Sequence, residues 1–175
     1  MIEYDNDERK EEVVRMTKVL IAYSSRGGNT ERLAQAVEEG ARGVEEVDVV
    51  LKRAADVTND DLMEIDALIV GSPVYFGCMS SEVKEMFDRS VAIRGRLEGK
   101  IGAAFTTSGH PTGGKETTML SILQAMLIHG MIVVGDPISS GGHYGVGTAG
   151  RPDSEILDAG KELGRRVCEI AKKLI

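Results

Sequence analysis

Short apolar runs alternate with amphipathic stretches along most of this chain. The apolar runs have the length of strands and several are rich in β-branched residues; they cover 19–23, 47–51, 67–70, 101–105 and 131–134. Between them, apolar residues recur at the spacing of a helix that buries one face. This spacing predicts helices at 30–44, 83–91 and 119–127, and a last helix from 152–154 to the C-terminus.

Five apolar strands separated by helices are typical of a parallel sheet that helices cover on both faces. We therefore predict one doubly wound α/β domain over residues 16–175, preceded by a charged extension at 1–15. Ligands of such sheets bind beyond the carboxyl ends of the strands. The candidate site is therefore made by four loops that follow predicted strands, at 24–30, 72–78, 106–115 and 135–151.

Composition and charge exclude several classes of protein. The 175 residues carry a formal net charge of −7 and only 4% aromatic residues, so the basic surface and stacking rings of a nucleic-acid binder are missing. No apolar run approaches the ~18 residues of a membrane helix, and the charged N-terminus lacks the apolar core of a signal peptide. Cys78 and Cys168 are isolated, which indicates reduced thiols in a cytoplasmic protein and no metal site.

The first loop has the sequence SSRGGNT and joins the first strand to the first helix. Hydroxyls, backbone N–H groups and a helix N-terminus converge there, and together they are the donor set of a phosphate site. No GK[ST] follows the glycines, so the loop is not a Walker A motif. The alternative interpretation is a tight turn in which Asn29 or Thr30 caps the helix.

Aromatic and hydroxyl residues mark the second and third loops. Tyr75 and Phe76 follow the third strand, and adjacent side chains of an extended segment point in opposite directions. One of the two rings is therefore expected to cover a flat ligand while the other packs inward; the alternative is that both belong to the core. The third loop, 106–115, offers backbone and hydroxyl donors to the polar edge of a ring.

Two glycine motifs imitate nucleotide-binding sequences. Residues 109–115 fit GxxxxGK, but Glu116 stands where a magnesium-binding Ser or Thr is needed, which disfavours a triphosphatase. Residues 145–150 fit GxGxxG without directly following a predicted strand, so we predict a flexible loop there. His143 and Tyr144 in that loop either reach a ligand or a neighbouring subunit, or are simply solvated.

Three longer motifs in order carry a family resemblance. They are VLIAYSSRGGNTERLA, DALIVGSPVYFGCMS and FTTSGHPTGGKETTMLSILQAMLIHGMIVVG. Together they resemble the flavodoxin-like fold and, more closely, the WrbA-type NAD(P)H:quinone oxidoreductases. The resemblance runs from Lys18 to the C-terminus, and it implies a five-stranded parallel sheet in the order 2-1-3-4-5 with helices on both faces.

The resemblance implies FMN as the cofactor, NADH or NADPH as co-substrate, and a quinone-like small molecule as electron acceptor. It implies a homodimer or homotetramer, and the composition predicts neither nucleic acid nor a membrane as partner. The implied FMN phosphate ligands are Ser25, Arg26, Gly27, Gly28, Asn29 and Thr30. The implied ring and ribityl contacts are Pro73, Val74, Tyr75, Phe76, Thr107, Ser108, Gly109, His110 and Gly113.

His129 has two interpretations. Taken alone, a histidine just after a helix and before Gly130 satisfies terminal carbonyls and complements the helix dipole. The resemblance instead matches it to a family histidine that lies near the flavin, contributed by the same or a neighbouring subunit. In this family the flavin performs the chemistry, so no catalytic side chain is implied and His129 is at most an assisting residue.

Other functional classes and arrangements stay open. The net charge of −7 suits docking to basic partners, as in a flavodoxin-type electron carrier. An iron–sulfur flavoprotein is disfavoured because two isolated cysteines cannot supply four thiolates. The apolar residues at 119–127 exceed one buried stripe, so we expect part of this helix to form a subunit interface; the alternative is a deeply buried helix.

Overall fold

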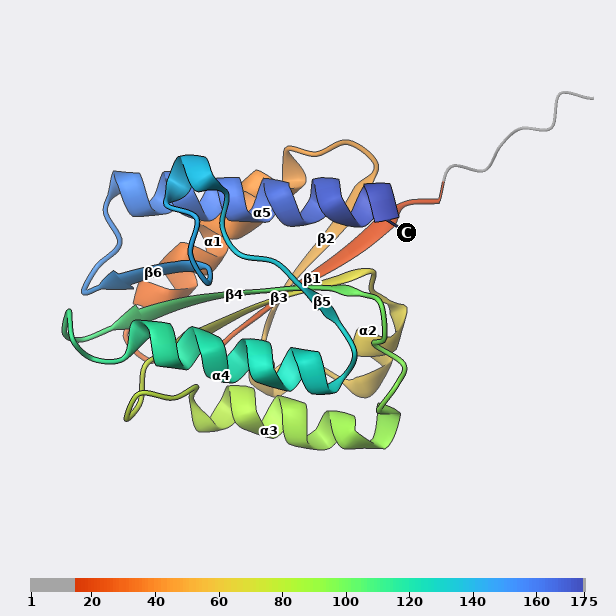
Figure 1. The fold of residues 1–175 in the computed structure, drawn as a ribbon, viewed down its shortest axis with the longest axis horizontal. Helices are drawn as coiled ribbons and strands as arrows, with labels where there is room; N and C mark the ends of the chain where they lie inside the picture. Colours follow the sequence, from red (N-terminus) through yellow and green to blue (C-terminus); the bar gives the residue numbers. More distant parts are fainter. Residues whose placement is uncertain (1–14, 175) are drawn as a thin grey trace, which may run out of the picture.

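The chain folds into a parallel sheet with helices on both faces (Figure 1). The structure is a computed structural model that describes residues 15–174, so most of the predicted extension at 1–15 lies outside the described residues. The strands are β1 (Thr17–Tyr23), β2 (Val47–Arg53), β3 (Ala67–Pro73), β4 (Ile101–Ser108), β5 (Ile132–Val133) and β6 (Val146–Ala149). The helices are α1 (Asn29–Arg42), α2 (Asn59–Glu64), α3 (Ser81–Arg89), α4 (Lys115–Ile128) and α5 (Ser154–Leu174).

The strand order is β2-β1-β3-β4-β5, and β6 also pairs with β4. The predicted order 2-1-3-4-5 and the flavodoxin-like fold are therefore confirmed. Every strand pair is parallel, and β3 and β4 are buried along almost their whole length. Strands that are covered on both faces need apolar side chains on both, which explains the continuous apolar runs in the sequence.

Side chains of the central strands alternate between two apolar layers. Leu20 of β1 joins a cluster with α3 and α4, whereas Ile21 joins a cluster with α1 and α5. Figure 1 shows the same division, with α3 and α4 below the sheet and α1 and α5 above it. Because all strands run in one direction, the loops after β1, β3 and β4 meet at one edge of the sheet.

The edge of the sheet beside β4 differs from the sequence prediction. The predicted strand 131–134 is reduced to the two residues of β5, and the predicted loop 135–151 returns to the same edge as β6. Phe105 to Ser108 of β4 pair with β6, so the GxGxxG segment contains a strand and is not a flexible loop. Its glycines permit this pairing at close range: a Cβ on Gly145 would lie 1.9 Å from the carbonyl oxygen of Ala104. We call residues 134–145, between β5 and β6, the edge insertion.

None of the helices within residues 15–174 combines the length and the apolar character needed to cross a membrane.

Candidate functional site

Three of the four predicted loops are joined through Thr107, at the carboxyl end of β4. The Thr107 hydroxyl lies 2.8 Å from the hydroxyl of Thr30, on the first turn of α1. The Thr107 carbonyl accepts a hydrogen bond from the N–H of Val74 at 2.8 Å, in the loop after β3. Both threonines are almost fully buried, so these contacts fix the spacing of the loops after β1, β3 and β4. The structure therefore brings together the predicted site residues of all three loops.

The first loop leaves the N-terminus of α1 open to an anion. Its N-cap is Gly28, in the left-handed conformation, and no side chain of the described chain caps this helix. The first helical bond runs from the Arg32 N–H to the Gly28 carbonyl, so the preceding amides of the turn have no intrahelical acceptor. The alternative interpretation, a turn capped by Asn29 or Thr30, is therefore wrong. The Gly28 N–H donates to the Ser25 hydroxyl oxygen at 3.1 Å. The other N–H groups of the turn and the helix dipole together favour a phosphate.

Arg53, at the end of β2, supports the first loop from outside the motif. Its Nη2 donates to the carbonyl of Ser25 at 2.6 Å, and its guanidinium lies over the ring of Tyr23 at 5.6 Å from the centroid. The Tyr23 hydroxyl donates to Glu31, and burial together with that carboxylate raises the Tyr23 pKa. The sequence prediction missed Arg53, although a basic residue just beyond an apolar strand, at the ligand-binding edge, is a usable signal.

The second loop makes a tight turn that exposes Phe76. Tyr75 and Cys78 exchange two backbone hydrogen bonds, at 3.1 and 3.0 Å. The two residues between them, Phe76 and Gly77, have φ values of 52° and 74°, the pattern of a type I′ turn. Phe76 is fully exposed and Tyr75 is 37% exposed, so neither ring packs inward. The expectation that one of them does is wrong, because Phe76 lies in a turn and not in an extended segment, and the alternative that both belong to the core is wrong too. A phenylalanine in left-handed backbone costs about 1–2 kcal/mol, and strain of this kind concentrates at functional sites.

The third loop is held against the second by hydroxyl groups and glycines. The Thr117 hydroxyl lies 2.7 Å from the Gly77 carbonyl oxygen and 3.0 Å from that of Gly114. A Cβ on Gly114 would lie 2.7 Å from the Gly77 Cα, so only glycine permits this approach. The Ser108 hydroxyl donates to the carbonyl of His110 at 2.7 Å and so closes the loop. The two loops therefore form the sides of one opening.

Hydrogen bonds also orient the ring of His110. The Thr112 N–H donates to His110 Nδ1 at 3.2 Å, so Nδ1 acts as an acceptor in this loop and Nε2 carries a proton. The imidazole is exposed at the same edge of the sheet. It therefore presents an N–H donor that the loop itself does not consume.

His129 is not brought together with the other predicted site residues. It is the C-cap of α4, at the opposite end of this helix from the third loop. Gly130 follows with φ 79°, and the Met131 N–H donates back to the Met126 carbonyl, which ends the helix in a Schellman motif. His129 is 7% exposed and packs against Ser90 and Phe87, so its place in the fold is that of a helix-terminal residue.

The hydrogen bonds of His129 define its tautomer. Ser90 uses its hydroxyl proton on the Phe87 carbonyl at 2.7 Å, so at 2.8 Å it accepts from His129 Nε2. The Nδ1 atom is then a bare acceptor, and it is buried without a partner in the described chain. Burial, and secondarily the charge of Arg94, lower the pKa of this histidine.

This geometry predicts a pH-dependent contribution of His129 to stability. The unfolded histidine takes up a proton near pH 6.5, whereas the folded one resists until a lower pH. The unfolded state therefore binds more protons in that window, and stability is lost as the pH falls below about 6.5. We expect urea unfolding to show that the free energy of unfolding falls less between pH 7 and pH 5 in His129→Gln than in the wild type. Equal losses would contradict the burial of a neutral ring.

The two cysteines differ in environment. Cys168 lies in α5 within the core, and burial raises the pKa of its thiol to about 12. Cys78 is exposed at the end of the second-loop turn. Neither arrangement supplies the paired thiols of a redox motif.

Comparison with known proteins agrees with this geometry. Residues 17–145 match the family described as NADPH-dependent FMN reductase. An Archaeoglobus fulgidus protein named NAD(P)H dehydrogenase (quinone) is 37% identical, with 91% of this chain and 100% of that protein covered. An Aquifex aeolicus flavodoxin is 40% identical, with 88% and 86% covered. The crystal structure of a flavodoxin, WrbA-like protein from Agrobacterium tumefaciens has a TM-score of 0.78 at 25% identity, with 91% and 99% covered.

These similarities cover all three loops, because the matched residues begin in β1 and extend through α4. They also confirm the resemblance to flavodoxin-like FMN proteins on which the predicted site rests. The chain therefore belongs to the NADPH-dependent FMN reductase family.

Proposed function

We propose that this protein is an FMN-dependent oxidoreductase that transfers reducing equivalents from NADH or NADPH to a quinone or a similar small acceptor. One observation carries the proposal. The N-terminus of α1 is uncapped, and the contact between Thr30 and Thr107 holds it beside the opening between the second and third loops. The first feature suits a phosphate and the second a flat ring. One ligand with both parts is FMN, the flavin in the family's description.

The residues present fit FMN. We assign its phosphate to the turn at 27–30, whose N–H groups other than that of Gly28 are available, and to the hydroxyl of Ser25, with Arg26 at the rim. Arg26 lies over the Tyr75 ring at 5.2 Å from the centroid, a cation–π contact that connects the phosphate end of the site to its ring end. The ring and ribityl contacts proposed from the sequence remain Pro73, Val74, Tyr75, Phe76, Thr107, Ser108, Gly109, His110 and Gly113.

FMN, when bound, supplies the atom N5 that accepts a hydride and passes two electrons on. The chain's own residues orient the ring and the reactants. His110 would offer its Nε2 proton as a hydrogen-bond donor to bound FMN, because its Nδ1 accepts the Thr112 N–H. The exposed rings of Tyr75 and Phe76 offer apolar faces to a flat nicotinamide or quinone. No side chain needs to form a covalent bond in this scheme.

We further propose that the protein works as a homodimer or homotetramer. Four apolar residues of α4 (Met119, Ile122, Leu123 and Met126) are buried in the chain's own core, so most of this helix is not available as an interface. Leu127 and Ile128 are 55% and 69% exposed at its end, and Ile132 of β5 is 46% exposed. These three residues are the apolar surface we assign to subunit contact. Light scattering should give a multiple of the chain mass that Leu127→Lys reduces; a monomeric wild type would contradict the assignment.

A second candidate function is a flavodoxin-type carrier that delivers single electrons to protein partners. The observation in its favour is the 40% identical relative that is named a flavodoxin. A carrier needs the same three loops for FMN but no access for a nicotinamide nucleotide. The two functions therefore differ in which molecules reduce and reoxidise the bound flavin.

Turnover under anaerobic conditions separates the two functions. The FMN-loaded protein is mixed with NADH or NADPH and a benzoquinone, and nicotinamide oxidation is followed against a control with the same concentration of free FMN. We expect catalytic oxidation well above the control, with one quinone reduced to the hydroquinone for each nicotinamide oxidised. A rate equal to that of free FMN with both nucleotides would contradict the oxidoreductase and favour the carrier.

A further inference from the structure

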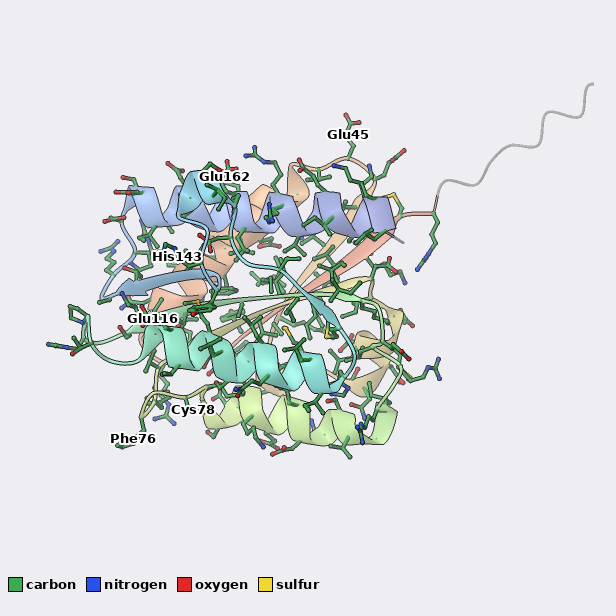
Figure 2. The ribbon with its side chains drawn as sticks, in the orientation of Figure 1. Glu45, Phe76, Cys78, Glu116, His143 and Glu162 are labelled. Carbon is green, nitrogen blue, oxygen red and sulfur yellow. The ribbon has the colours of Figure 1, made fainter. Side chains whose placement is uncertain are left out.

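A cavity of about 240 Å³ lies beside the proposed flavin site, outside the residues assigned to FMN. We call it the edge pocket. Its walls come from the start of α4, the edge insertion, β6 and the start of α5. Figure 2 shows Glu116 of α4 and His143 of the edge insertion at this end of the molecule. Both glycine motifs that imitate nucleotide-binding sequences border this pocket: the motif at 109–115 ends at it with Lys115, and the motif at 145–150 begins at it with Gly145.

The floor of the edge pocket is apolar and its rim is polar. Met119 and Val146 are almost fully buried beneath it, with Ile156 and Ala159 of α5 at its side. The volume falls below the ~300–1,000 Å³ of sites for drug-sized ligands, so it suits a single ring system. An apolar floor of this kind favours a ligand that can lay a flat apolar face against it.

Polar side chains at the rim have no partners within residues 15–174. Lys115, Glu116, His143 and Tyr144 all line the pocket, and the last three are exposed. Within residues 15–174, none of these four side chains makes a hydrogen bond or an ion pair with another residue. Two rim residues of opposite charge, Lys115 and Glu116, stand next to each other. A purely anionic ligand would meet the Glu116 carboxylate and a purely cationic one the Lys115 ammonium. The rim therefore favours an uncharged ring that carries both donors and acceptors.

Hydrogen bonds and close backbone contacts within the edge insertion hold the wall of the pocket in place. Asp136 is buried, and its carboxylate accepts the N–H groups of Gly142 at 3.0 Å and His143 at 2.7 Å, which closes the edge insertion. A Cβ on Gly135 would lie 2.0 Å from the His143 carbonyl oxygen, so the backbones of these two residues are in direct contact. The Asp136 charge is satisfied by these donors and leaves the rim residues free for a ligand.

The pocket adjoins the flavin loop directly. Lys115 follows Gly113 and Gly114 of the third loop, and β6 pairs with β4 as far as Ser108, where that loop begins. A group bound in the pocket therefore lies next to a molecule bound on the flavin side of the loop.

We propose that the edge pocket binds an uncharged purine-type ring, and specifically the adenine end of the nicotinamide nucleotide. The exocyclic amine of adenine is a donor for Glu116, and its ring nitrogens are acceptors for Lys115 and the Tyr144 hydroxyl. This inference rests on the proposed function for the source of the ring. The same chemistry also describes a free nucleoside, so the experiment includes competition between the two.

The test is ligand-observed NMR of adenosine with the FMN-loaded protein, which blocks the flavin site. Ala159→Leu fills the pocket from α5, and Glu116→Ala removes the carboxylate. The matched control is Glu155→Ala, a carboxylate of α5 that does not line the pocket. We expect each pocket variant to weaken adenosine binding at least tenfold, no change in the control, and displacement of adenosine by NADPH. In turnover, Ala159→Leu should raise the KM for NADPH and leave kcat unchanged.

Two results would overturn the proposal. Adenosine binding that is absent, or unchanged by both pocket variants, would show that the pocket holds no purine. Binding in the pocket that NADPH does not displace would assign it to a free nucleoside and contradict the link to the nicotinamide nucleotide. Failure of the proposed function has a different signature, because NADPH would then displace adenosine without reducing the flavin.

Discussion

Gly27→Glu is expected to lower the affinity for FMN by about 100-fold, or about 2.8 kcal/mol, and to leave the fold intact. A Cβ on Gly27 meets nothing within 4 Å, and the residue is exposed, so the new side chain has room. Its carboxylate would stand in the loop that we assign to the dianionic phosphate. Two like charges a few ångströms apart, partly shielded from water, repel by this order of energy. Quenching of flavin fluorescence in a titration measures the change.

Riboflavin and a remote carboxylate are the controls for this prediction. Riboflavin has the same ring without the phosphate, so its affinity should be the same for the variant and the wild type. Gln124→Glu adds the same charge on an exposed turn of α4 and should leave FMN binding unchanged. An equal loss of riboflavin affinity in Gly27→Glu would mean that the substitution disturbs the ring site and that the phosphate assignment is wrong.

Gly164→Ala is expected to destabilise the protein by about 2–3 kcal/mol, although alanine is the better helix former by about 1 kcal/mol. A Cβ at this position of α5 would lie 2.0 Å from the Val37 carbonyl oxygen, on the backbone of α1. The reverse contact exists at Gly40, where a Cβ would lie 1.9 Å from the Lys161 carbonyl oxygen. The two helices are therefore in backbone contact and must separate to admit a methyl group. Thermal unfolding should show a Tm lower by roughly 5–10 °C.

Gly160→Ala is the matched control on the same helix. There the nearest atom is the Leu33 Cδ1 at 2.9 Å, the far end of a flexible side chain that can move. We expect a change in the free energy of unfolding of less than about 1 kcal/mol. Equal destabilisation by the two substitutions would argue against backbone contact as the cause.

The sequence pattern predicts the sheet well where strands are buried on both faces and less well where the site begins. The apolar run predicts a strand that ends at Phe105, but β4 continues to Ser108. Its last three residues are polar and yet buried, because their hydroxyls have partners, such as the Ser72 carbonyl for Thr106 at 2.6 Å. Burial of satisfied polar groups leaves no apolar signal. Strand ends that carry a binding site are therefore underestimated by periodicity.

Other elements of the fold could not be predicted from the sequence pattern, because they are too short or depend on contacts between distant segments. β6 consists of VGTA, and only its pairing with β4 makes this glycine-containing segment a strand. α2 was missed because six residues are too few to show a helical period, although Thr58 and Asp61 form a capping box at its start. The residues around His129 indicate the end of a helix, but they do not show whether that end lies at the ligand-binding edge of the sheet or at the opposite edge.

The most direct measurement is a titration of the flavin-free chain with FMN, followed by anaerobic addition of NADPH. We expect saturation at one FMN per chain, with the flavin fluorescence quenched, and then loss of the oxidised flavin absorbance when NADPH is added. Bound FMN that neither NADPH nor NADH reduces would contradict the oxidoreductase. A chain that does not retain or rebind FMN would contradict the site itself.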